Sequence, residues 1–270
     1  MGVELRKLRE HAGIPAREAA RVAGVDQGKM SNIESGRAAV SEERLRRLAA
    51  HYGVTDSALV DALVSLATER VRGWWEKYHG VVTPRSVDLA VAEWQARSIS
   101  SLQVVHIPGL LQTEAYARSL FTQLPPELQP DDVELIVDFR MRRQELLDRD
   151  DPPPYTVFVH EAALRMRVGA RSVVREQLLQ VAESSERPGV TVRVVPFAAE
   201  GYVCMGYTMQ YLASDVPQLD TVQVDEALGS VFLDAEEWLK RYRTVLGTLE
   251  RFALDAESSR DLVLSIAREV

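Results

Sequence analysis

Apolar residues in the first 56 positions recur every three or four residues, in short runs separated by turn signals. This spacing is typical of amphipathic helices, because 3.6 residues make one helical turn. Asp26 and Ser41 stand where N-terminal helix caps are expected. Glu42 and Glu43 follow Ser41, in the first turn of a helix, where the helix dipole favours acidic side chains. The runs cover residues 5–12, 19–23, 30–33 and 45–52, and Gly13, Gly24 and Gly36 lie between them. We therefore expect a compact, all-α first domain over residues 1–56.

Residues 57–80 keep the helical spacing, with Leu59, Leu63 and Leu66 on one face, and predict a connecting helix. From residue 81 to residue 270 the pattern changes, and β-rich runs bounded by turn residues alternate with helical stretches. The predicted strands are 103–107, 155–159, 191–195, 207–212, 221–224 and 230–233, and the predicted helices are 86–100, 113–123, 131–149, 172–186, 234–252 and 255–269. This mixture predicts an α+β C-terminal domain with a small mixed sheet.

Charge is distributed unevenly along the chain. The net charge is −8, but residues 1–55 carry ten basic and seven acidic side chains and are +3, which leaves −11 for the rest. A mildly basic head on an acidic body suits a module that touches phosphate while the body stays away from it. No apolar run approaches the ~18 residues of a membrane span, no signal-peptide core follows Met1, and Cys204 is the single cysteine. We expect a cytoplasmic protein with no membrane contact and no disulfide framework.

Residues 14–37 carry the candidate chemistry of the head. Small Ala19 and Ala20 let two helices cross closely, and Gly24 permits the tight turn between them. Met30 and Ile33 fix the next helix to the core, so its outer face and N-terminal end carry Gln27, Gly28, Lys29 and Asn32. A helix fits the major groove of DNA, where amide side chains read adenine and lysine reads guanine. A polar helix face is usually only a solvated surface, but the turn and the flanking helices favour DNA reading here.

At these residues, over roughly residues 3–55, the head resembles the Cro/lambda-repressor family, also called xenobiotic-response-element-type regulators. The resemblance implies a helix-turn-helix domain that binds double-stranded DNA. It also implies that Arg37 meets phosphate and that Arg9 and Glu34 form an internal ion pair between the first and third helices. Pro15 and Ala16 depart from the family, which usually has a Ser or Thr cap followed by a phosphate-touching Gln. The implied DNA-facing residues are Gln27, Gly28, Lys29, Ser31 and Asn32.

Four motifs characterise the body. They are Ile-Pro-Gly-Leu-Leu-Gln-Thr-Glu-Ala-Tyr-Ala at 107–117, Arg-Met-Arg-Arg-Gln-Glu-Leu-Leu at 140–147, His-Glu-Ala-Ala-Leu at 160–164 and Val-Thr-Val-Arg-Val-Val-Pro-Phe at 190–197. In this order they resemble the C-terminal domain of actinobacterial regulators of the WhiJ-like type, over approximately residues 70–268. The resemblance implies a regulatory domain. It also implies a small partner protein encoded by a neighbouring gene, in an arrangement likened to antitoxin and toxin.

Several residues of the body allow both a functional and a structural interpretation. Trp74, Trp75 and Trp94 could form an aromatic cage for a ligand, although aromatics at helical spacing more often form core. Pro108 and Gly109 predict a turn into the following helix, because a phosphate-binding loop needs a richer glycine pattern. We expect structural roles for both groups.

Two charged groups in the body are similarly ambiguous. The cluster of Arg140, Arg142 and Arg143 either binds an acidic partner or pairs with acids of its own helix. His160 and Glu161 invite a general-base interpretation, but no nucleophile or second partner lies within sequence reach. The five histidines show no metal-ligand spacing. We therefore expect no catalytic residue, no metal and no cofactor.

These patterns predict a sequence-specific DNA-binding transcription regulator that acts as a homodimer, with residues 81–270 sensing a partner protein or a small ligand. One helix reads few base pairs, so useful specificity normally needs two copies. The alternative is an antitoxin-like interaction protein that neutralises a small partner and regulates its own gene. An enzyme acting on a small molecule is a third class, which no acid–base pair, metal cluster or phosphate loop supports.

Overall fold

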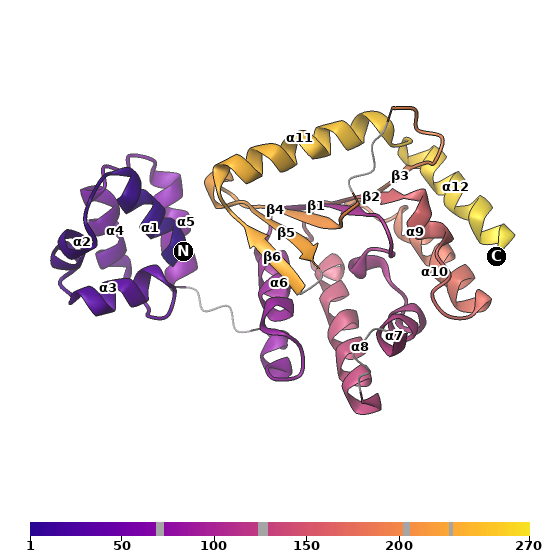
Figure 1. The fold of residues 1–270 in the computed structure, drawn as a ribbon, viewed down its shortest axis with the longest axis horizontal. Coiled ribbons are helices and arrows are strands. Elements are labelled where there is room, and N and C mark those ends of the chain that lie inside the picture. Colours follow the sequence, from indigo (N-terminus) through magenta and orange to yellow (C-terminus); the bar gives the residue numbers. More distant parts are fainter. Residues whose placement is uncertain (69–72, 124–128, 202–205, 227–228) are drawn as a thin grey trace. The chain divides into compact units, whose positions relative to one another are not determined.

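The computed structural model describes residues 1–68, 73–123, 129–201, 206–226 and 229–270 (Figure 1). Cys204 lies outside the described residues. The contacts within the chain divide it into two compact units. The first unit comprises Met1–Arg72 with Asp215–Leu219, and the second comprises Gly73–Ser214 with Asp220–Val270. Each unit has its own hydrophobic core, and the two are described separately below.

The first unit is all-α, as its sequence predicts. Its helices are α1 (Gly2–His11), α2 (Ala16–Ala23), α3 (Gln27–Glu34), α4 (Glu42–His51) and α5 (Ser57–Thr68). Gly24 ends α2 in the left-handed conformation with φ +65°, and Asp26 caps α3 by accepting a hydrogen bond from the Lys29 backbone N–H at 2.8 Å. Ser41 precedes α4, but its side chain makes no cap hydrogen bond. The core is built by Leu5, Ala19, Met30, Ile33, Leu45, Leu48 and Leu63.

The region between the two units differs from the single connecting helix predicted over 57–80. The helix α5 contributes Leu59, Leu63 and Val64 to the core of the first unit. The 3-10 helix η1 (Trp74–Tyr78) belongs to the second unit. Residues 69–72 lie outside the described part of the chain. The apolar residues of α5 and those of η1 therefore belong to two different cores, because their packing partners lie in different units.

The second unit is built on a six-stranded mixed sheet in the order β3-β2-β1-β4-β5-β6. The strands are β1 (Ser98–Gln103), β2 (Tyr155–His160), β3 (Val190–Val195), β4 (Met209–Ala213), β5 (Thr221–Glu226) and β6 (Gly229–Leu233). The strands β1, β2 and β3 run parallel to one another, and the remaining neighbours pair antiparallel. The predicted α+β architecture with a mixed sheet is confirmed.

Helices cover both faces of this sheet (Figure 1). On one face, α11 (Glu236–Phe252) packs Leu239 and Leu249 against sheet residues such as Phe158. On the other face, Val157 and Val159 point into a second cluster. The remaining helices are η1, α6 (Pro84–Gln95), η2 (Gly109–Leu111), α7 (Glu114–Gln123), α8 (Pro130–Gln144), η3 (Glu145–Asp148), α9 (Glu161–Arg165), α10 (Arg171–Ser184), η4 (Pro217–Leu219, assigned to the first unit) and α12 (Ala256–Glu269).

The first strand of the sheet lies earlier in the chain than its sequence pattern suggests. The apolar run at 103–107 predicts a strand, but β1 covers Ser98–Gln103 and the predicted helix over 86–100 ends at Gln95. Three of the six residues of this central strand are serines, so the sequence lacks the apolar pattern that predicts a buried strand. Ser101 is fully buried, and its hydroxyl shares a 3.2 Å hydrogen bond with the Tyr155 hydroxyl. The prediction was wrong because neighbouring strands satisfy the polar groups of β1, which a local pattern does not show.

Candidate functional site

The helix α3 buries one side and presents a polar face on the other. Met30 and Ile33 have no exposed surface. The residues expected at DNA are all exposed, namely Gln27, Gly28, Lys29, Ser31 and Asn32. Among the residues that the structure describes, no hydrogen bond occupies the side chain of Gln27, Lys29 or Asn32. Their donors and acceptors are therefore available to base edges.

Arg37 stands just beyond the C-terminal end of α3. Its backbone N–H donates to the Asn32 carbonyl at 2.8 Å, which folds the chain back against the helix. The exposed side chain donates through Nε to the Ser35 hydroxyl at 3.0 Å. This hydrogen bond orients the guanidinium without neutralising it. Its remaining N–H groups can therefore meet a phosphate.

The helix α2 adds two exposed cations that the sequence analysis does not single out. Pro15 begins α2 in extended conformation, and no side-chain hydrogen bond caps the helix there. Arg17 and Arg21 are exposed on α2, and together with Gln27 they line a shallow depression between α2 and the start of α3. Cations next to the polar face of α3 suit a surface that meets the DNA backbone. In the sequence, the only sign of them was the positive charge of residues 1–55.

Arg9 and Glu34 form a buried ion pair between α1 and α3. Arg9 Nε lies 2.6 Å from Glu34 Oε1, and Arg9 Nη2 donates to Glu34 Oε2 at 3.0 Å. Arg9 also donates to the Ile14 carbonyl at 2.8 Å. The hydrogen bond to Glu34, together with the attraction of its charge, raises the pKa of Arg9. The pair fixes the C-terminal end of α3 to α1.

Comparison with known families matches both units of the chain. A family model described as a helix-turn-helix domain matches residues 1–63. A second, described as a domain of unknown function (DUF5753), matches residues 87–265 and so covers well over half of the chain. The chain belongs to the DUF5753 family. Comparison with curated proteins gives no match, and comparison with solved structures gives none.

The helix-turn-helix match indicates a DNA-binding regulator, and it covers every residue of the polar face of α3. The DUF5753 region coincides with most of the second unit, including the whole sheet and α11. Among the helices that the structure describes, none has the length and apolar character needed to cross a membrane.

The arginine cluster of the DUF5753 region separates into three different environments. Arg143 forms a buried ion pair with Glu93 of α6, through Nη2–Oε1 at 2.6 Å and Nε–Oε2 at 2.9 Å. Arg142 lies 3.6 Å from Glu145, three residues further along the chain. Arg140 pairs with neither Glu93 nor Glu145, and it points into a cavity. Of the two sequence interpretations, pairing with a nearby acid along the chain holds for Arg142 alone, and its partner Glu145 begins η3 directly after α8.

His160 and Glu161 make structural contacts where β2 joins α9. His160 Nδ1 accepts a hydrogen bond from the Ala162 backbone N–H at 3.2 Å, which caps α9. Glu161 Oε1 lies 2.7 Å from Arg165 Nε, and its Oε2 accepts from the Phe197 backbone N–H at 2.8 Å. Burial lowers the pKa of His160. These contacts hold both groups in place at the C-terminal end of β2.

Three tryptophans of the second unit pack with other aromatic residues. Trp75 is 2% exposed, and its ring centroid lies 6.0 Å from that of Trp94. Trp74 packs against Phe139 at 5.2 Å. An aromatic cage needs an open space between its rings, whereas these rings fill one another's space. The core interpretation accounts for this group.

Proposed function

We propose that this protein is a sequence-specific transcription regulator of the Cro/lambda-repressor type that acts as a cytoplasmic homodimer. The observation that carries the proposal is the exposed, unoccupied polar face of α3, fixed to its core by Met30 and Ile33. Its N-terminal residues enter the major groove and read base edges. Arg37, with Arg17 and Arg21 of α2, neutralises phosphates and sets the register.

In this proposal the C-terminal unit is a regulatory domain of the WhiJ-like type, which receives a partner protein or a small ligand. Its acidity supports this division, since residues after 55 carry −11 and repel phosphate. The same charge favours the antitoxin-like alternative, in which a small basic protein binds the acidic body. An enzyme is the least supported class. The product of the adjacent gene, added to the complex with DNA, separates a partner-protein signal from a small-ligand signal. If the signal is that protein, it releases the duplex at stoichiometric amounts; if the signal is a small ligand, it does not.

The test begins with selection of bound sequences from a random duplex pool by the full chain. On the selected site, Gln27→Ala or Asn32→Ala should each cost about 1–3 kcal/mol of binding free energy and relax base preference at one position. Arg37→Ala should instead weaken all sequences alike and reduce the slope of log K against log salt by about one unit. Binding isotherms at several salt concentrations measure both effects.

Arg47→Ala is the matched control, because it also removes an exposed cation but from α4, where Arg47 pairs with Glu43. It should leave base preference unchanged. Circular dichroism of each variant establishes that the fold is intact. Normal affinity and base preference in a folded Gln27→Ala/Lys29→Ala/Asn32→Ala variant would falsify the proposed role of α3.

A further inference from the structure

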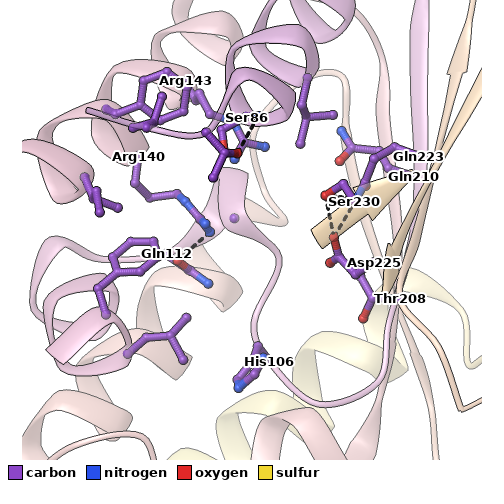
Figure 2. Close-up of a pocket in the computed structure, with 18 of the residues that line it drawn as sticks. Ser86, His106, Gln112, Arg140, Arg143, Thr208, Gln210, Gln223, Asp225 and Ser230 are labelled. Carbon is purple, nitrogen blue, oxygen red and sulfur yellow. Dashed lines mark hydrogen bonds between the residues drawn. The ribbon is translucent and has the colours of Figure 1, made fainter. Parts of the chain in front are cut away.

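The second unit contains a cavity of about 490 Å³, within the range typical of small-molecule sites. It lies among α6, the loop that follows β1, α7, α8 and the strands β4, β5 and β6. Its walls come from residues between Val81 and Ser230, all in the same unit. Figure 2 shows two polar groups facing each other across it, Arg140 with Gln112 on one side and Asp225 with Ser230 on the other.

Arg140 supplies the cationic wall of this cavity. Its Nη1 donates to Gln112 Oε1 at 2.9 Å, and its guanidinium lies 5.1 Å from the centroid of the Phe121 ring. Gly109 makes room for it, since a Cβ at that position would lie 2.6 Å from Arg140 Nη1. In the described ranges of the chain, no carboxylate oxygen lies within ion-pair distance of Arg140. The guanidinium donates its hydrogen bond to a neutral neighbour, and the carboxylates of Glu93 and Asp225 act on it only from a distance.

The environment of Arg140 opposes this charge. Burial, with a further contribution from the nearby charge of Arg143, lowers the pKa of Arg140 to about 9. Arg143 is not available to an anionic ligand in the same way, because it already donates two hydrogen bonds to Glu93. Arg140 is still protonated at neutral pH, and a half-buried cation without an ion-pair partner is costly. An anion entering the cavity would therefore gain from Arg140 what the protein itself does not supply.

The opposite wall is acidic and amide-rich. Asp225 Oδ1 accepts from Gln223 Nε2 at 2.6 Å and from the Ser230 hydroxyl at 3.0 Å. Its Oδ2 has no hydrogen-bond partner among the residues that the structure describes. Asp225 is exposed, and its Oδ2 is available to a cation or a hydrogen-bond donor that enters the cavity. The lining also includes apolar and aromatic side chains of α7 and α8, namely Leu120, Phe121, Ile136 and Phe139.

His106 completes the polar lining. Figure 2 places it below the gap between Arg140 and Asp225. Burial, and the charge of Arg140 after it, lower the pKa of His106, so it is neutral at pH 7. The free charges of the cavity are thus one cation at Arg140 and one anion at Asp225. This balance fits a ligand that carries one anionic and one cationic group, and it disfavours a doubly charged phosphate.

We propose that this cavity binds a zwitterionic small molecule of amino-acid or dipeptide size, whose carboxylate pairs with Arg140 and whose protonated amine is directed at Asp225. The apolar side chain of the ligand packs against Phe121 and Phe139. A guanidinium and a carboxylate form the strongest pairing available in such a site. The inference rests on the proposed sensing role of the C-terminal unit, and it names the chemical class of the signal.

The test measures binding to the full chain in the absence of DNA. The twenty standard amino acids and their alanyl dipeptides are screened at millimolar concentration for a rise in melting temperature, and titration calorimetry then gives Kd. At least one zwitterion should bind saturably. The analogue of that compound without its carboxylate, and the analogue without its amine, should each bind at least about tenfold more weakly.

Variants test which residues bind the ligand. Arg140→Gln should abolish the binding, and Arg140→Lys should restore part of it, because a lysine keeps the charge but not the fork of donors. Asp225→Asn should weaken the zwitterion without weakening the amine-free analogue. Arg142→Gln is the matched control on the same helix, since Arg142 lies beside Glu145 and does not line the cavity. Its binding should equal that of the unmodified protein.

Three results would overturn the inference: no compound of the panel binds, binding persists unchanged in Arg140→Gln, or the carboxylate-free amine binds as tightly as the zwitterion. The calorimetry contains no DNA, so failure of the α3 variants to alter DNA reading leaves this result untouched. Conversely, a protein that binds the zwitterion and no duplex would contradict the proposed function and leave the ligand site standing.

Discussion

The Arg9–Glu34 pair shows how individual residues stabilise the surface that is proposed to meet DNA. Both side chains are about a tenth exposed or less, so each charge has lost most of its hydration. Two parallel hydrogen bonds and the Ile14 carbonyl replace that hydration. Because Glu34 is the last residue of α3, the pair controls how the helix is held against α1.

Glu34→Gln keeps the size of the side chain but leaves the buried Arg9 with only the exposed Glu10, whose Oε1 lies 3.5 Å from Arg9 Nη2, as its acidic neighbour. We expect the free energy of unfolding to fall by about 3–5 kcal/mol. Urea unfolding of the full chain measures this loss. Glu42→Gln is the control, because Glu42 forms an exposed pair with Arg46 at 2.8 Å, and it should cost less than about 1 kcal/mol. Similar losses in the two variants would contradict the structural role of the buried pair.

The helix α11 has a buried face, where packing against the sheet decides stability, and an exposed face, where only the intrinsic helix propensity of each residue matters. Leu239, Val245 and Leu249 are buried against the sheet. Gly247 lies on the exposed side of the same helix, and a Cβ at that position would meet no atom within 4 Å. Glycine in an exposed helix interior is less favourable than alanine because the unfolded chain gains more backbone freedom. The helix therefore contains a weak position that packing does not require.

Gly247→Ala should raise the free energy of unfolding by about 0.5–1 kcal/mol, measured by urea unfolding. The same substitution at Gly2 of α1 should act in the opposite direction. A Cβ there would lie 2.3 Å from the Ile33 carbonyl oxygen, which is backbone and cannot rotate away. Gly2→Ala should therefore destabilise the head. Destabilisation by Gly247→Ala would show that α11 has a contact on its outer face.

For the whole molecule, the relevant property is the division of charge and labour between the two units. The head is +3 over residues 1–55, and it carries a single eight-residue recognition helix. One such helix contacts few base pairs, so a site read with useful specificity needs two heads. The remaining residues carry −11, a charge that repels phosphate. The protein as a whole should therefore bind DNA as a two-fold pair.

Footprinting of the full chain on its selected site should show two protected half-sites. Their centres should be separated by about 34–36 Å, one turn of B-DNA, or by a multiple of that distance. Sedimentation of the protein with and without the duplex gives the stoichiometry, which should be two chains per site. A single asymmetric footprint with one chain per site, from a protein that sediments as a monomer, would contradict the dimer.

Local signals in the sequence determined the helices of the head and the exposed face of α3. Asp26 caps α3 through a residue only three positions away, and Gly24 needs no partner beyond its own turn to adopt a positive φ. The spacing of Met30 and Ile33 likewise fixes which residues face outward, because helix geometry is periodic. Such features depend on neighbours within about one turn. They could therefore be predicted from the chain alone.

The tertiary structure alone decided the position of β1 and the roles of the arginines on α8. Ser101 is a buried strand residue only because Tyr155 offers it a hydrogen bond. Arg140 and Arg143 are three residues apart and both line the cavity, yet only Arg143 pairs with Glu93. Both outcomes depend on residues fifty or more positions away, or on space left between elements. Because a side chain's charge environment is set by neighbours in space, the sequence could not distinguish them.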